Sequence, residues 1–138
     1  MNYHNKKCIE MSGLGLAEKE RMSRLSQILT DLKSQGNLIG VLFAERNGKV
    51  IYIVGEENFN YEEFSSMCAS VLESASELSK AMGEKRIEKI ITEVEDKIII
   101  ILECDKNTFL VLMANSESHT NKVLSKMENY IKKLLILY

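Results

Sequence analysis

The stretch KIIIILECDKNTFLVLMA, residues 97–114, holds two apolar runs separated by a short polar segment. Each run has the length of one strand, and the intervening Asp105-Lys106-Asn107 consists of residues that favour turns. A strand with one face in water alternates apolar and polar residues, whereas these two are apolar almost throughout. We therefore expect an antiparallel pair of strands with helices on both faces, as in a three-layer α/β/α sandwich.

Three further strands are expected upstream of this pair. The segment LIGVLFAERNGKVI, residues 38–51, contains two strand-like runs around Asn47-Gly48, a strong hairpin signal, and predicts strands at 38–45 and 49–54. Residues 86–94 predict a strand with several charged side chains among its isoleucines, and this density of charge suits the edge of a sheet. The expected sheet therefore has five antiparallel strands.

Apolar residues at three- and four-residue steps predict amphipathic helices at about 16–35, 60–82 and 118–137. Gly36-Asn37 is expected to end the first helix and Asn60 to cap the second. We interpret residues 16–138 as one α/β (α+β) domain and residues 1–15 as a polar leader without predicted structure.

The composition argues against several classes of function. Basic and acidic residues are mixed and the net charge is −2, so no basic surface for nucleic acid is expected. No apolar run has the length of a membrane span and no signal peptide is visible, which predicts a cytoplasmic protein. Three scattered cysteines and two histidines offer no metal-site spacing. No phosphate-binding loop or catalytic constellation is recognisable, so we expect neither a cofactor nor an enzyme.

The helix at 60–82 has an unusual composition, because serines fill most of its polar positions. Serine is a mediocre helix former, but small side chains let another helix approach closely. We predict that one strip of this helix contacts a second subunit; the alternative is a solvated, serine-rich face. The strip comprises Ser65, Ala69, Leu72 and Ser76. The neighbouring apolar stripe is expected to be core, and includes Tyr61, Phe64, Met67, Val71 and Leu78.

The order of these elements, the hairpin at 38–51 and the helix rich in small residues resemble the roadblock/LC7 family over residues 19–137. The resemblance implies a profilin-like fold with strand order 2-1-5-4-3. It also implies that the chain forms a dimer, either with a second copy of itself or with a paralogous roadblock subunit. The implied interface is the helix at 60–82 and the edge strand at 86–94, and the candidate contacts on that strand are Glu88, Ile90 and Thr92. Members of this family act as non-enzymatic regulators or platforms for small Ras-like GTPases, or as dynein-associated chains.

A GTPase is expected to dock on the outward part of the helix at 60–82. The candidate contacts are Glu63, Ser66, Ser70, Glu73 and Glu77. A different hypothesis is a small-molecule sensor domain of PAS or longin-like shape. Such a sensor needs a cavity with polar groups that orient the ligand, and the strongly apolar strands offer few of them.

Overall fold

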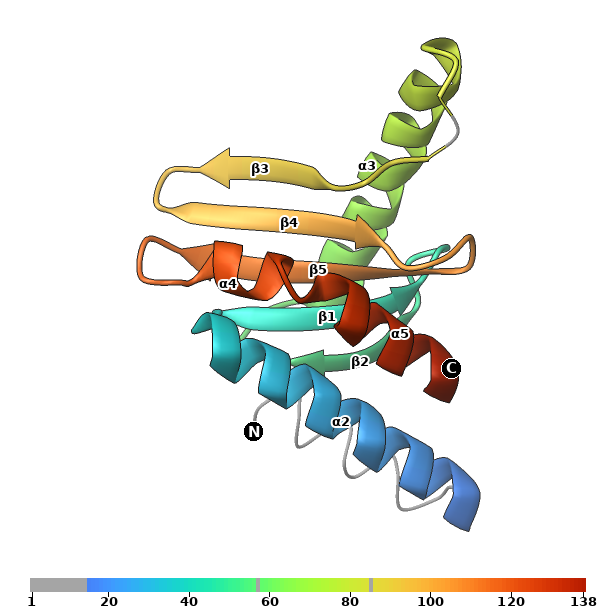
Figure 1. Ribbon diagram of the computed structural model, residues 1–138, viewed down its shortest axis with the longest axis vertical. Helices are drawn as coiled ribbons and strands as arrows, with labels where there is room; N and C mark the ends of the chain where they lie inside the picture. Colours follow the sequence, from blue (N-terminus) through green and yellow to red (C-terminus); the bar gives the residue numbers. More distant parts are fainter. Residues whose placement is uncertain (1–14, 57, 85) are drawn as a thin grey trace.

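The computed structural model describes residues 15–56, 58–84 and 86–138. The predicted polar leader therefore lies, except for Gly15, outside the described residues. Figure 1 shows the elements in their spatial arrangement. In chain order they are α2 (Leu16–Gly36), β1 (Gly40–Glu45), β2 (Val50–Val54), α3 (Tyr61–Ala81), β3 (Ile90–Val94), β4 (Lys97–Glu103), β5 (Thr108–Asn115), α4 (Thr120–Leu124) and α5 (Met127–Leu137).

The strands form one five-stranded antiparallel sheet in the order β2-β1-β5-β4-β3, which confirms the predicted topology. The two apolar strands β4 and β5 pair directly, with Ile100 opposite Leu112, and β5 occupies the centre of the sheet. The prediction from residues 97–114 was therefore right for a physical reason: strands apolar on both faces must lie where both faces are covered.

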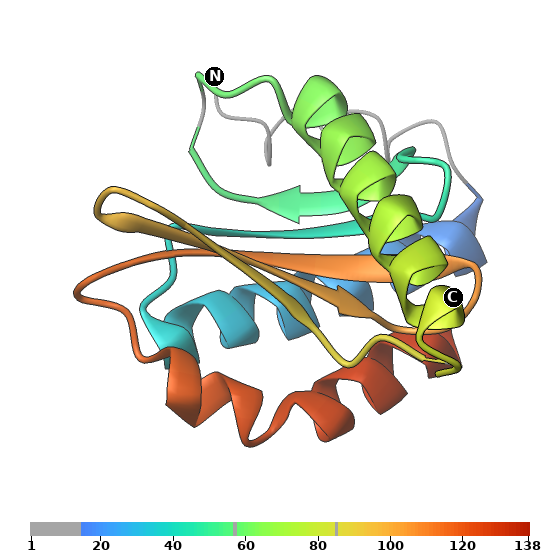
Figure 2. The same cartoon turned by 90° about the horizontal axis from the view of Figure 1, so that it is seen from above.

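Two separate clusters of buried side chains lie on the two faces of the sheet. One contains Leu29 of α2 and Leu134 of α5 together with Ile100 of β4, and the other contains Leu72 of α3 together with Ile101 of β4. Neighbouring residues of β4 thus point to opposite faces, as the pleat requires. Figure 2 shows α3 on one side of the sheet and α2, α4 and α5 on the other, the predicted three-layer sandwich.

The β1–β2 hairpin forms where it was predicted, around Asn47-Gly48. Gly48 alone of the Asn47-Gly48 pair has a positive φ, +96°, and its N–H donates to the Glu45 carbonyl at 2.8 Å. The register shifts between Phe43 and Ala44. This is a turn followed by a bulged glycine, which adds twist to the hairpin and turns its tip toward α3.

The predicted helix caps are confirmed with one refinement. The Asn60 side chain accepts a hydrogen bond from the Glu63 N–H at 3.1 Å, so it caps α3 as expected. At the end of α2 it is Asn37 that takes the left-handed conformation, with φ of 47°. Gly36 is buried against Val123, where a larger side chain would not fit without movement.

Two predicted boundaries were wrong. The last helix is divided into α4 and α5. The start of α4 is held at the end of α2, because the His119 N–H donates a hydrogen bond to the Gly36 carbonyl at 2.7 Å. Helix α5 then follows a different course along α2. The edge strand begins at Ile90 rather than residue 86. Glu88 and Lys89 precede the ladder and stay exposed, which keeps their charges hydrated.

Candidate interaction surface on helix α3 and strand β3

Helix α3 crosses the sheet and continues past its edge. Figure 1 shows the last turns of α3 beyond β3, where no strand lies beneath them. The helix is long because its 21 residues include no glycine or proline, and Gly83, with φ of +81°, follows soon after its end. The buried residues of α3 are confined to its first twelve positions, Tyr61 to Leu72. In the second half of the helix no residue is fully buried, and Leu78 is exposed.

The sheet-facing side of α3 combines small and large side chains, since its buried residues are Tyr61, Ser65, Cys68, Ala69 and Leu72. Ser65 and Leu72 have no exposed surface and Ala69 has 8%. The predicted subunit contact through these three residues is wrong, because they are already covered by the sheet of the same chain. Helix α3 also comes close to the tip of the β1–β2 hairpin, because a Cβ added to Gly48 would lie 2.9 Å from the Ser66 Cα. The Ser65 hydroxyl is buried without a hydrogen-bond partner among the described residues.

Ser76, the fourth residue of the predicted strip, is also engaged within the chain. Arg46 donates from Nη2 to the Ser76 Oγ and from Nη1 to the Glu103 carboxylate, both at 2.7 Å. The Glu73 carboxylate lies 3.9 Å from the same guanidinium group. This half-buried arginine ties the β1–β2 hairpin, β4 and α3 together, and so fixes the direction in which α3 leaves the sheet.

One flank of α3 carries large apolar side chains that remain in water. The exposed fractions are 55% for Met67, 44% for Val71, 67% for Leu78 and 79% for Met82. The expectation that Met67, Val71 and Leu78 belong to the core was therefore wrong. Helix α3 has an apolar arc wider than the strip that the sheet can cover. We call this set, Met67, Val71, Leu78 and Met82, the apolar flank of α3.

The neighbouring sheet edge is also partly apolar and exposed. Strand β3 pairs on one side with β4, through Ile90 opposite Ile101 and Thr92 opposite Ile99, and no described strand pairs with its other side. Ile91 is 50% exposed and Val94 is 52% exposed. The predicted contacts Ile90 and Thr92 lie on this edge strand, whereas Glu88 precedes it.

A hollow of about 440 Å³ connects the start of α3 with the β3–β4 turn. Phe59 packs against Tyr61 and Phe64, with ring centroids 4.8 and 5.1 Å apart, and forms one wall. Val94, Ile98 and Ile99 line the other side. Burial, followed by the nearby Glu56 carboxylate, raises the pKa of Tyr61 to about 12. The hollow is lined mainly by apolar side chains.

The remaining face of α3 is polar. The five predicted GTPase contacts, Glu63, Ser66, Ser70, Glu73 and Glu77, are all exposed and recur along one polar side of α3, which borders the hairpin turn at Ser66 and Arg46 at Glu73. Their side chains make local interactions: the Ser70 hydroxyl donates to the Ser66 carbonyl at 3.2 Å, and Glu77 pairs with Lys80 at 3.4 Å. α3 therefore presents three distinct faces: one on the sheet, one apolar and exposed, and one acidic with small residues.

Comparison with known proteins agrees with this architecture. The model of the roadblock/LC7 domain matches residues 25–114, which is most of the chain. The chain belongs to the roadblock/LC7 family. Protein MJ0311 of Methanocaldococcus jannaschii is 26% identical over 106 residues, covering 77% of this chain and 96% of its own length.

Two solved structures place this roadblock/LC7 chain among known folds. The gliding protein MglB of Thermus thermophilus has a TM-score of 0.77 at 16% identity, with coverage of 90% of this chain and 92% of that protein. Profilin IA of Acanthamoeba castellanii has a TM-score of 0.52 at 10% identity, with coverage of 77% and 94%. The fold is therefore profilin-like, as predicted.

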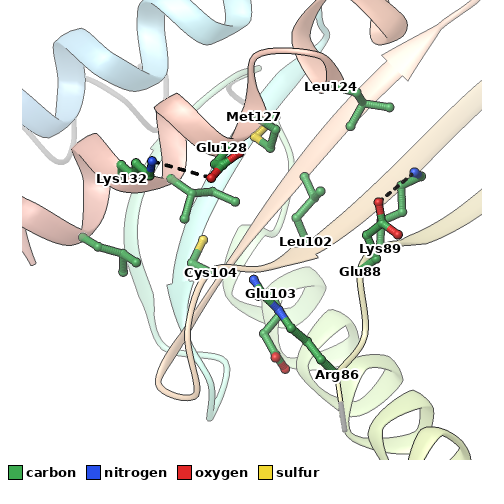
Figure 3. Close-up of a pocket in the computed structure, with 12 residues that line it drawn as sticks. Arg86, Glu88, Lys89, Leu102, Glu103, Cys104, Leu124, Met127, Glu128 and Lys132 are labelled. Atoms are coloured by element: carbon green, nitrogen blue, oxygen red, sulfur yellow. Dashed lines mark ion pairs between the residues drawn. The ribbon is translucent and has the colours of Figure 1, made fainter. Parts of the chain in front are cut away.

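A groove runs on the opposite side of the sheet in this roadblock/LC7 chain, between α5 and the segment before β3. Figure 3 shows its apolar floor, which includes Leu102, Cys104 and Met127, and its charged rim, where Glu128 pairs with Lys132 at 3.5 Å. Burial raises the pKa of the Cys104 thiol to about 12, and that of Cys68, on the α3 side, to about 11. Neither thiol is a nucleophile at neutral pH.

Among residues 15–56, 58–84 and 86–138, no group of three or more potential metal ligands comes together. In the same residues, no helix has the length and hydropathy needed to cross a membrane.

The feature of this roadblock/LC7 chain that sequence reasoning placed wrongly is the apolar flank. A signal was available, since the apolar and small residues of α3 together cover more than half of its circumference, which is more than one sheet contact needs.

Proposed function

We propose that this chain is a non-enzymatic interaction module that dimerises, with itself or with a paralogous roadblock subunit, and binds a small Ras-like GTPase in the cytoplasm, which it regulates or anchors. The observation that carries the proposal is the apolar flank of α3 beside the open edge of β3. Large exposed apolar side chains that recur along one flank of a helix, beside an open sheet edge, are typical of protein interaction sites. The membership of the roadblock/LC7 family supplies the expected kind of partner.

The geometry of these two features supports a dimer. Pairing of β3 with β3 of the partner about a twofold axis would satisfy the open edge and make one sheet across both subunits. The projecting half of each α3 would then lie over the partner's sheet. Leu78 and Met82, which have no sheet beneath them in their own subunit, would reach the partner's aromatic hollow at Phe59 and Phe64. Each subunit thus supplies both the protruding side chains and the hollow that receives them.

The GTPase would dock on the polar faces of the two α3 helices, which such a dimer sets side by side. That face carries Glu63, Glu73 and Glu77 with small serines between them, so it can approach a partner closely and favours a basic counter-surface. Ser66 and Ser70 would lie at the centre of the contact. Charges at the rim influence the association rate and its salt dependence more than the affinity.

The test is isothermal titration calorimetry of the full chain against candidate Ras-like GTPases loaded with GDP or with a GTP analogue. Ser70→Arg introduces bulk and a positive charge at the predicted centre and is expected to abolish binding, while Glu77→Lys, at the rim, should change the affinity much less. Lys133→Glu, on the opposite side of the sheet, is the control and is expected to bind normally. Binding by no GTPase in either state contradicts the proposal, and so does GTP hydrolysis by this chain alone. Binding that survives Ser70→Arg moves the docking site elsewhere.

A further inference from the structure

The helices on the two sides of the sheet carry opposite charge. Helix α3 has four glutamates and one lysine. The segment 120–137, which forms α4 and α5, has four lysines and one glutamate and contains no aspartate or arginine. All four lysines are exposed. We call the set Lys122, Lys126, Lys132 and Lys133 the basic patch.

The charges of the basic patch are mostly uncompensated. Lys132 pairs with Glu128 at 3.5 Å, and the Lys133 ammonium lies 5.8 Å from the Tyr130 ring centroid. Among the described residues, no carboxylate oxygen lies within 4.0 Å of the ammonium of Lys122, Lys126 or Lys133. Three positive charges therefore point into water on one helical layer, where an anionic surface can approach them.

Apolar side chains protrude at one end of the same layer. Leu16, at the start of α2, is 85% exposed and Ile136, near the end of α5, is 83% exposed. These two ends lie beside each other, because Arg21 of α2 stacks on the Tyr138 ring at 5.7 Å, and Figure 1 shows them on the same side of the molecule. Exposed lysines together with protruding leucine and isoleucine side chains are typical of helices that rest on a lipid surface.

We propose that the α4–α5 layer of this protein binds an anionic lipid membrane peripherally, with the basic patch against the headgroups and Leu16 and Ile136 inserted between them. The composition favours lipid over an acidic protein. Lysine is depleted from protein interfaces and arginine is enriched there, because immobilising a lysine side chain has a large entropic cost. A fluid layer of headgroups neutralises lysines without fixing them in one conformation.

This inference connects with the proposed dimer. A dimer made through β3 and α3 would place both basic patches on one side and both acidic α3 faces on the other, since the twofold axis relates layers of the same kind. The doubled patch would bind by avidity, and the α3 faces would point away from the membrane toward a soluble GTPase. Only the gain from doubling rests on the proposed function; the patch itself belongs to one subunit.

The experiment is co-sedimentation of the full chain with phosphatidylcholine vesicles that contain roughly one-third phosphatidylglycerol. The test variant is the triple substitution Lys122→Gln, Lys126→Gln and Lys133→Gln. Each lysine near an anionic surface contributes about five-fold to binding, so we expect a loss on the order of 100-fold. The matched control is Lys49→Gln, Lys80→Gln and Lys106→Gln, which changes the net charge equally on the α3 side and should leave binding unchanged.

A second readout reports insertion directly. The chain contains no tryptophan, so Ile136→Trp provides a single tryptophan, which can be excited selectively over the five tyrosines and whose emission should shift to the blue on anionic vesicles. Lys106→Trp, on the α3 side, should show no shift. The proposal is overturned if the wild-type chain does not bind the anionic vesicles at low salt, if both triple variants lose binding equally, or if the chain binds soluble polyglutamate and not the vesicles. The Leu78→Glu variant separates the two proposals. As a monomer it should bind vesicles more weakly than the wild-type dimer, and adding the three lysine substitutions of the basic patch should still remove that remaining binding.

Discussion

Replacement of Leu78 by alanine tests whether the apolar flank of α3 forms a dimer contact. Leu78 is 67% exposed in the single subunit, and full burial of a leucine side chain stabilises by roughly 1.5–3 kcal/mol. Burying the remaining surface at an interface is therefore worth about 1–2 kcal/mol per subunit. A symmetric dimer contains the residue twice, so Leu78→Ala should weaken dimerisation by about 2–4 kcal/mol, or roughly 30- to 700-fold in Kd. Leu78→Glu should weaken it further, because it places a charge in the contact.

The measurement is sedimentation velocity at about 10 µM, a concentration at which a dimer of micromolar or tighter Kd is largely assembled. The control is Glu77→Ala, one residue away on the polar face, which should remain dimeric. Circular dichroism should show that Leu78→Glu stays folded, since the side chain is exposed in the subunit and glutamate is a good helix former. Ala69→Arg, by contrast, should unfold the subunit, because Ala69 packs on the sheet. A monomeric wild type, or a Leu78→Glu variant that is still dimeric, would refute this reasoning.

Four further outcomes are expected. Ser65→Ala should raise the free energy of unfolding by about 1 kcal/mol in urea titration, because it removes a buried hydroxyl without a partner; a destabilised variant would contradict this. Gly48→Ala should lower it by about 2 kcal/mol or more, since it adds a Cβ at positive φ against α3, whereas Asn47→Ala should change it less. The Tyr130 hydroxyl donates to Asp31 at 2.9 Å, and burial raises the pKa of Tyr130 to about 12. Between pH 10 and 12 the folded state therefore keeps a proton that the unfolded state loses, so the free energy of unfolding should fall as the pH rises through this range. Tyr130→Phe should flatten this fall. In a Cys8→Ser variant, Cys68 and Cys104 should resist a disulfide reagent at pH 8 until the protein is unfolded, and rapid reaction of the native protein would show that they are accessible.

The sequence by itself determined the elements and their order. Apolar runs at 98–102 and 109–113 required a sheet covered on both faces, Asn47-Gly48 required a hairpin, and Asn60 fixed the start of α3. These are local effects of patterning, turn residues and caps, and each acts over a few neighbouring residues. The limits of the edge strand and of the last helix were not determined in this way, because they depend on contacts with Ile101 of β4 and with Gly36 of α2, both distant in sequence.

The tertiary structure alone decided which side of α3 faces the sheet. The periodicity of the helix marks a wide arc of apolar and small residues, and a helical wheel ranks Leu72 and Val71 almost equally. Close packing made the choice: Ser65 and Ala69 let the helix approach the sheet and the turn at Gly48, while the bulkier Met67 and Leu78 were left outside. The arginine contact between Arg46 and Ser76 then set the direction in which α3 passes the β3 edge. Which surface is left for a partner follows from that packing, because a sheet covers only part of a helix and the sequence does not specify which part.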